Sequence, residues 1–372
     1  MKRLLPSLTL VLASLALPAA AATGAAPAPS MPATAQEWRA AALRDIEAGY
    51  RVTLANHAGA RDPHNPAFLT HLDAAKAHGL ALAARVEDAA GYQAALLGFS
   101  NRIGDGHAGV YPARELEAGQ PLQWPGFVAA WRGALFVHAV QEGAARPGER
   151  ILSCDGNPVE RLLEENVFGY LGRIKEEGQW WSESGKLFLD AGNPFVTRPR
   201  RCLFELAGKR TERTLDWRPM PDAARAWLDT SVIGEVLPVG LGEPRPGLFW
   251  MAMPSFKPSD QERATYRAVY QKVRTERSRF LQADAVVVDL RGNSGGNSQW
   301  SRDFAAALWG EARVNRRVEA RDAKEEVWYR ASPGNIAYFE GLVDKFTAQG
   351  ETALVQTLTT LLDGLRAAAA AN

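Results

Sequence analysis

The chain has 372 residues and a mass of 40.5 kDa, which is enough for two or three domains. Hydrophobic residues make up 46% and charged residues 23%, a globular composition that excludes an intrinsically disordered chain. The 43 Lys and Arg residues nearly equal the 42 Asp and Glu residues, which argues against nucleic acid as a partner because phosphate binding needs surplus basic residues. Two cysteines exclude a disulfide-rich scaffold and a multi-cysteine zinc site, and we expect no cofactor and no metal.

Residues 1–22 have the pattern of a signal peptide. Lys2 and Arg3 precede an apolar stretch that runs to Leu17, and Ala20 to Ala22 supply the small residues of a cleavage site. A membrane anchor is the alternative, but the stretch is too short to span a bilayer and no charged stop follows it. We therefore expect cleavage and export to the periplasm or the medium. No later segment is long and apolar enough to predict a membrane span.

If the chain is exported, residues 23–36 become its N-terminal segment and the two cysteines can be oxidised. Residues 23–36 are rich in Ala, Pro and Ser and show no apolar period, so we expect a flexible leader. The mature chain would carry 41 basic and 42 acidic residues, since Lys2 and Arg3 are the only charged residues before Thr23. Cys154 and Cys202 would meet an oxidising compartment, where one disulfide or two buried thiols are both possible.

The range 37–120 reads as an N-terminal helical region, because apolar residues recur at steps of three and four, with Pro-containing turns near residues 62–66. Four histidines fall there at intervals of seven: His57, His64, His71 and His78. On a continuous helix two such histidines stand about 10.5 Å apart, too far to share one metal ion. We therefore interpret them as surface residues.

The range 121–219 predicts a small β-domain with one helix. Strands are expected over 127–140 with a turn at Gly133, as one short strand between two turns within 147–159, and in a hairpin around Gly208. A short helix is expected over 160–167. A structural module without a ligand is equally compatible with this pattern.

The range 220–372 begins a third unit with α/β character. We expect a strand over 248–253, a helix opened by a capping box of Ser259 and Glu262, and a strand over 283–290. The last strand is a run of β-branched residues, typical of a strand that is buried on both faces. A glycine-rich turn and a helix over 298–309 follow, and residues 336–365 have a helical period.

The glycine-rich turn, residues 292–296, is the first candidate site. It reads Gly-Asn-Ser-Gly-Gly between a strand and a helix, which literally matches the nucleophile elbow G-x-S-x-G. An elbow enzyme places its histidine after the serine, whereas the last histidine here is His138, and we therefore do not favour Ser294 as a nucleophile. The N–H groups of Gly295 and Gly296 are better candidates for holding an oxyanion. A simple tight turn that needs glycine fits as well.

The second candidate is the loop Asp105-Gly106-His107-Ala108-Gly109. A histidine in a polar loop flanked by glycine can act as a general base near neutral pH. Taken alone, the same pattern also fits an ordinary loop histidine.

Together these segments resemble the tail-specific, or carboxyl-terminal processing, serine peptidases and their tricorn-core relatives. The resemblance covers about residues 90–310 and rests on four stretches in the family's order: 105–107, 147–159, 253–256 and 288–296. It implies a PDZ-like domain over 121–219 that presents a polypeptide or a peptide C-terminus, and a partial α/β protease core over 220–372. It also implies Gly295 or Gly296 as an oxyanion-hole donor. His107 is similar to the histidine that serves as the base in the tricorn-like branch, whereas in the lysine-dyad branch the base would be a lysine placed after the serine.

The family's nucleophile follows the glycine turn in a stretch of small residues, and nothing after Gly296 matches it. Ser298 and Ser301 fall in the next predicted helix, and Ser332 precedes a Pro-Gly loop. We therefore expect an α/β, multi-domain α+β chain that resembles an incomplete and inactive secreted serine endopeptidase. The alternative is a non-catalytic, PDZ-like peptide-binding protein of the same family. The sequence does not indicate the oligomeric state.

Overall fold

The computed structural model describes residues 31–112, 116, 121–141, 143–322 and 327–371. Contacts divide the described chain into two compact units, of which one is Val232–Val327 and the other joins the chain up to Ser231 with the residues from Trp328 on. Helices and sheets of largely antiparallel strands make up the fold, which confirms the predicted multi-domain α+β class. The range predicted as one core, 220–372, is shared between the two units. The predicted signal peptide lies outside the described residues.

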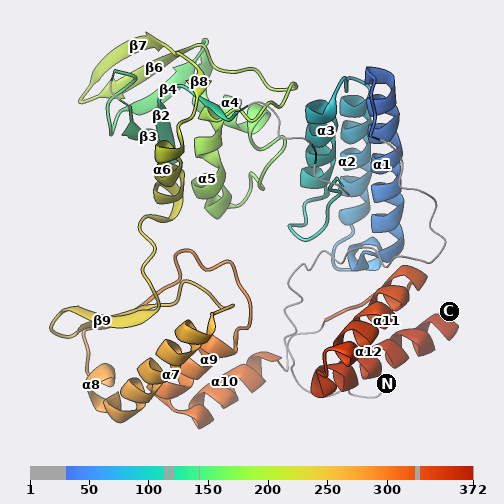
Figure 1. Cartoon of the computed structure of the whole chain (residues 1–372), viewed down its shortest axis with the longest axis vertical. Helices are drawn as coiled ribbons and strands as arrows, with labels where there is room; N and C mark the ends of the chain where they lie inside the picture. The colour runs from blue at the N-terminus through green and yellow to red at the C-terminus, as the bar shows by residue number, and fades with distance from the viewer. Residues whose placement is uncertain (1–30, 113–115, 117–120, 142, 323–326, 372) are drawn as a thin grey trace. The chain divides into compact units, whose positions relative to one another are not determined.

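The N-terminal region is helical, as predicted, and its elements are α1 (Ala35–Asn56), the 3-10 helix η1 (Ala58–Arg61), α2 (Phe68–Ala83) and α3 (Ala89–Ile103). Helices α1, α2 and α3 lie side by side (Figure 1) and enclose a core that includes the fully buried Ile46, Leu72 and Phe99. Helix α1 starts two residues before the predicted region, because Thr34 and Glu37 form a capping box. Helix α3 ends at Gly104, whose φ of 80° suits glycine.

The predicted β-module is an antiparallel sheet in the order β2-β3-β4-β6-β7. Its strands are β2 (Phe127–Trp131), β3 (Leu135–Val140), β4 (Arg150–Cys154), β6 (Arg201–Leu206) and β7 (Lys209–Thr214), and β5 (Asn157–Pro158) pairs with β4. A separate pair joins β1 (Gln123–Trp124) to β8 (Arg218–Pro219). The expected strands and the hairpin between β6 and β7 are confirmed.

The prediction of a single helix in this module is wrong. Besides α4 (Val159–Asn166), the range 121–219 contains α5 (Glu177–Glu183) and the 3-10 helix η2 (Ser184–Phe188), and α6 (Asp222–Ile233) follows it. Helix η2 packs so closely on β2 that a Cβ atom at Gly185 would lie 2.4 Å from the carbonyl oxygen of Ala129. Trp180 on α5 packs against Trp131 at a ring distance of 4.7 Å. These aromatic contacts bury one side of the sheet.

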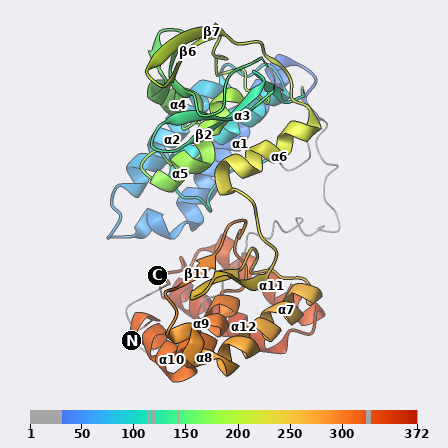
Figure 2. The same ribbon diagram turned by 90° about the vertical axis from the view of Figure 1, so that its left-hand side faces the viewer.

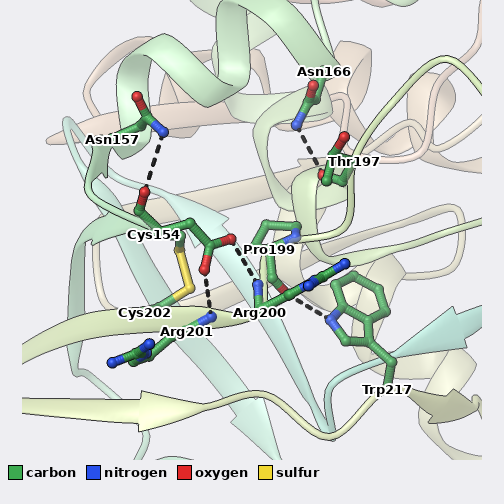
Figure 3. The surroundings of a disulfide bond; sticks show 10 residues. Cys154, Asn157, Asn166, Thr197, Pro199, Arg200, Arg201, Cys202 and Trp217 are labelled. Atoms are coloured by element: carbon green, nitrogen blue, oxygen red, sulfur yellow. Dashed lines mark hydrogen bonds between the residues drawn. A yellow bond between two sulfur atoms is a disulfide. The ribbon is translucent and has the colours of Figure 1, made fainter.

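The two cysteines form a disulfide, which settles the choice that the sequence leaves open. Cys154 on β4 and Cys202 on β6 are register partners in neighbouring strands, and both are fully buried. Figure 3 shows the bond beside the β4–β5 turn, where the carboxylate of Asp155 accepts the N–H groups of Arg200 and Arg201 at 2.8 and 3.0 Å. The disulfide and these hydrogen bonds join the same two strands.

The unit Val232–Val327 contains a three-stranded sheet in the order β11-β10-β9. Its strands are β9 (Gly240–Arg245), β10 (Leu248–Ala252) and β11 (Ala285–Asp289), and its further helices are α7 (Asp260–Thr275), α8 (Arg277–Leu281), α9 (Gln299–Trp309) and α10 (Glu311–Asp322). Alternate residues of β10, Phe249 and Met251, pack against α7, α8 and α9, which lie on one face of the sheet (Figure 2). The capping box of Ser259 and Glu262 opens α7, as predicted.

The expectation that residues 283–290 are buried on both faces is wrong. Within the described residues, β11 pairs only with β10, in parallel, and is an edge strand. Val288 is 45% exposed and Leu290 is 49% exposed. A β-branched run reports strand propensity, whereas burial depends on whether neighbouring elements cover both faces.

The predicted C-terminal helical segment is two helices, α11 (Pro333–Ala348) and α12 (Thr352–Ala370). Asn56 at the end of α1 connects them to the N-terminal helices: its Oδ1 accepts the Ser332 hydroxyl at 2.7 Å, and its carbonyl accepts Asn335 Nδ2–H at 2.9 Å. Among the residues that the structure describes, no helix has the length and apolar character needed to cross a membrane.

Candidate functional site

His107 lies in the loop that follows α3, at the edge of a pocket of about 460 Å³. Its side chain is 90% exposed. Helix α3, the loop, the segment after α4, and α5 line the pocket, with the residues Leu97, Ser100, Asn101, Asp105, Gly106, His107, Ala108, Tyr111, Tyr170, Leu171, Gly172, Arg173 and Gln179. The lining mixes apolar, aromatic and hydrogen-bonding groups, and the volume lies in the range of sites that bind small organic groups.

Asp105 fixes the conformation of this loop. Its Oδ1 accepts the backbone N–H of His107 at 2.8 Å, and its Oδ2 lies 3.0 Å from Nε2 of His57. The Nδ1 atom of His107 is 3.8 Å from Oδ1 of Asp105, which is too long for a hydrogen bond but close enough for electrostatic attraction. His57 comes from the end of α1, 48 residues before Asp105, and sequence reasoning missed this contact.

Asp105 is ionised in this setting. Burial raises the pKa of its carboxyl, but the N–H of His107 and the imidazole of His57 lower it by more, so the net shift of the pKa is downward. A carboxylate beside an imidazole is the arrangement that orients a histidine base.

Arg173 also lines the pocket and is paired with Glu176. Arg173 donates from Nε and Nη2 to the two carboxylate oxygens of Glu176, at 2.5 and 2.8 Å. Its remaining Nη1 lies against the loop, where a Cβ atom on Gly106 would come within 2.7 Å of it. Asn101 on α3 connects this helix to the segment after α4, because its Nδ2 donates to the carbonyl of Phe168 at 2.7 Å. Glycine at position 106 therefore allows Arg173 to approach.

The four regularly spaced histidines have two different environments. His64 and His71 are exposed, as predicted, whereas the interpretation is wrong for His57 and His78, which are half-buried. Desolvation lowers the pKa of His78, and Arg102 adds to the effect. No cluster of three or more His, Cys, Asp or Glu side chains in the described ranges could hold a metal ion.

The second candidate, the turn 292–296, belongs to the unit Val232–Val327. The N–H of Gly295 is hydrogen-bonded to Oδ1 of Asn293 at 2.9 Å, and Nδ2 of Asn293 donates to the carbonyl of Met253 at 2.8 Å. The N–H of Gly296 has no acceptor within the described part of the chain, and it is therefore the better oxyanion donor of the two.

An ion pair at the end of β11 supports this turn. The carboxylate of Asp289, only 7% exposed, accepts hydrogen bonds from Nε and Nη2 of Arg291 at 2.9 and 2.6 Å. It also accepts the backbone N–H of Arg291 and the indole N–H of Trp250, each at 3.0 Å. The Arg291 side chain therefore holds the pKa of Asp289 far below its ordinary range, despite the opposing effect of burial.

The candidate serines differ in how their hydroxyls are used. Ser294 is exposed on the turn, and Ser298 is exposed at the start of α9. The hydroxyl of Ser301 donates to the carbonyl of Ser298 at 2.8 Å. Ser332 is 6% exposed and caps α11, because its hydroxyl accepts the N–H of Asn335. Ser301 and Ser332 therefore have structural roles, and no serine hydroxyl hydrogen-bonds to His107 among the described residues.

Gly296→Ala is expected to destabilise the unit Val232–Val327 more than Gly295→Ala. Both positions have positive φ, 130° and 96°, so each alanine costs about 1–3 kcal/mol of backbone strain. At Gly296 a Cβ atom would also lie 2.3 Å from the carbonyl oxygen of Phe256, whereas Gly295 has nothing within 4 Å. Urea unfolding of both variants measures the difference, and equal losses would show that Gly296 does not pack against Phe256.

No protein-family model matches this chain, and no curated protein matches it significantly. Among solved structures, mature CPAF complexed with lactacystin is similar, with 14% sequence identity and a TM-score of 0.48. The match covers 72% of this chain and 59% of the other, so the chain spans less than two thirds of that structure.

Proposed function

We propose that this chain is a polypeptide-binding protein related to the tail-specific serine peptidases, and that this 372-residue form binds its ligand without hydrolysing it. The observation that carries the proposal is the exposed imidazole of His107 on a mixed polar and apolar pocket, beside the ionised Asp105. The ligand is an extended polypeptide, of which one or two side chains enter the pocket.

Histidine, oxyanion donor and nucleophile act in acyl transfer as a unit, so the loss of one removes most of the activity. The resemblance implies His107 as the base and Gly296 as the oxyanion donor of the related peptidases' catalytic set. Ser301 and Ser332 supply no nucleophile, because their hydroxyls already serve α9 and α11. Ser294 is the remaining candidate on the turn.

The finer parts of the proposal concern the β-module and the location of the protein. We infer that the module over 121–219 presents the polypeptide as a PDZ-like domain, through an added strand. Export, inferred from residues 1–22, agrees with a buried disulfide, because disulfides persist in oxidising compartments.

The test has a catalytic arm and a binding arm. A fluorophosphonate probe should leave the chain unlabelled, and unfolded casein should stay intact. Fluorescently labelled unfolded casein should still bind, and His107→Ala should weaken binding at least threefold. His71→Ala is the matched control, because His71 is exposed on α2 and does not line the pocket.

Three outcomes would contradict the proposal. Stoichiometric labelling at Ser294 would identify a nucleophile elbow, and cleavage of casein would show a complete catalytic unit. Equal binding by the wild type and His107→Ala would remove the pocket from polypeptide recognition.

A further inference from the structure

His57 has both of its ring nitrogens engaged. Nδ1 accepts the N–H of Gly59 at 3.0 Å, so the ring proton lies on Nε2, which donates to Oδ2 of Asp105 at 3.0 Å. The ring also stacks on Phe68, with centroids 4.4 Å apart and planes 12° from parallel. These three contacts fix the position of the ring and the tautomer.

Asp105 connects the fixed ring of His57 to His107 at the pocket. With Oδ2 bound to His57, the other oxygen, Oδ1, is directed at the backbone N–H of His107 and lies 3.8 Å from its Nδ1. A hydrogen bond from Nδ1 would need a rotation of the exposed imidazole toward Oδ1, and catalytic hydrogen bonds that are long in a free protein often tighten when a ligand binds. The carboxylate then favours a proton on Nδ1.

We propose that His57 is a positioning residue: acting through Asp105, it holds His107 in the tautomer with the proton on Nδ1, which leaves Nε2 free to accept a proton from a ligand. The inference rests on the proposed function only for the role of His107. His107 makes no contact with His57, so the sequence motif around His107 does not point to His57.

Two neighbouring groups do not replace this effect. Arg173 attracts Asp105 electrostatically, but two of its nitrogens are bound to Glu176. Phe68 contacts the ring of His57 without a hydrogen-bonding group and fixes only its plane. Nε2 of His57 is therefore the side-chain donor that orients the carboxylate, together with the backbone N–H of His107.

Nitrogen-15 NMR of histidine-labelled full-length protein at pH 9 tests the proposal, because it distinguishes the two neutral tautomers of each imidazole. In the wild type we expect His57 with its proton on Nε2. We expect the Nδ1–H to Nε2–H ratio of His107 to be about fivefold higher than in Asp105→Ala, the factor that corresponds to one ordinary hydrogen bond.

Two substitutions separate positioning from packing. His57→Phe keeps a ring against Phe68 but has no donor, and it should lose most of the fivefold enrichment. His57→Gln keeps an N–H donor and should retain it. Unchanged signals of His71 on α2 would show that both variants are folded.

An unchanged His107 ratio in folded His57→Phe, or equal loss in both His57 variants, would overturn the positioning role. Either result would leave polypeptide binding and the probe-labelling results untouched. Conversely, failure of His107→Ala to weaken casein binding would overturn the proposed function while the tautomer result could still hold.

Discussion

Asp289→Asn is expected to destabilise the unit Val232–Val327 by about 2 kcal/mol, because it breaks the hydrogen-bonded ion pair of the buried Asp289 carboxylate with Arg291, whose side chain is 39% exposed. The carboxylate accepts hydrogen bonds from four N–H groups: Nε, Nη2 and the backbone N–H of Arg291, and the indole N–H of Trp250. An amide of the same shape removes the negative charge and turns an NH₂ group toward these donors. Hydrogen exchange of peptides from β10 and β11 during urea unfolding measures the loss locally.

The lowered pKa of Asp289 also predicts how the stability of this unit depends on pH. Its pKa in the folded protein lies well below the ordinary value of about 3.9, mainly because Arg291 donates to it. A group with a lowered folded pKa stabilises the protein fully above its unfolded pKa, and this contribution is lost as the pH falls toward the folded value. The stability gap between wild type and Asp289→Asn should therefore be full at pH 7 and shrink below about pH 4.

Asp284→Asn is the matched control for this prediction. Asp284 precedes β11 and pairs with Arg245 at 2.9 Å, but the two side chains are 65% and 60% exposed. An exposed pair contributes about 0–1 kcal/mol, so this variant should unfold close to the wild type. Similar losses in both variants, or a gap that widens in acid, would contradict the assigned role of Asp289.

Local sequence signals located most of the secondary structure. The Ser259–Glu262 capping box marks the start of α7 because both partners are three residues apart and need no distant group. The turns at Gly133 and Gly208 have φ values near 77°, which glycine adopts readily, and the β2–β3 and β6–β7 hairpins form there. Such features depend on a few consecutive residues, which explains why sequence alone reveals them.

The contacts that shape the candidate site are not local. His57 meets Asp105 only because α1 and α3 pack together, and its spacing to the other histidines suggested a surface stripe instead. The burial of β11 was also overestimated, because the run of valines does not indicate how many strands flank it. Pocket residues such as Arg173 and Gln179 come from segments without a recognisable motif. Tertiary packing, rather than propensity, decides each of these cases.

The two histidines of the candidate site differ in how clearly the sequence marks them. His107 lies in a loop with two flanking glycines, which marks it as a candidate, whereas His57 closes a long helix and looks ordinary. On the turn, Gly295 and Gly296 are equivalent in the motif, but the Asn293 side chain already binds the N–H of Gly295. The structure therefore separates a free backbone donor from an occupied one within a single motif.

Reduction of the Cys154–Cys202 disulfide is expected to destabilise the β-module by about 4 kcal/mol, the largest effect we predict. The bond closes a loop with a sequence separation of 48 residues, and constraining a loop of this size lowers the entropy of the unfolded chain by about that amount. Both cysteines are fully buried in the sheet core, so a reagent could not reach them in the folded protein even if they were free thiols, and the test therefore uses denaturant. Thiol alkylation in denaturant without reductant, followed by mass spectrometry, should find no free cysteine.

The stability loss is measured by urea unfolding of the oxidised and the reduced chain, because the two forms share every side chain. The double variant Cys154→Ala/Cys202→Ala is the control: reductant should leave its unfolding midpoint unchanged, since it has no disulfide to reduce. The strands β4 and β6 remain paired through their backbone register and through Asp155, so the reduced module should stay folded near 25 °C but unfold at lower urea. Two alkylated thiols in the untreated protein, or identical midpoints for the oxidised and reduced chains, would show that the cysteines are buried thiols instead.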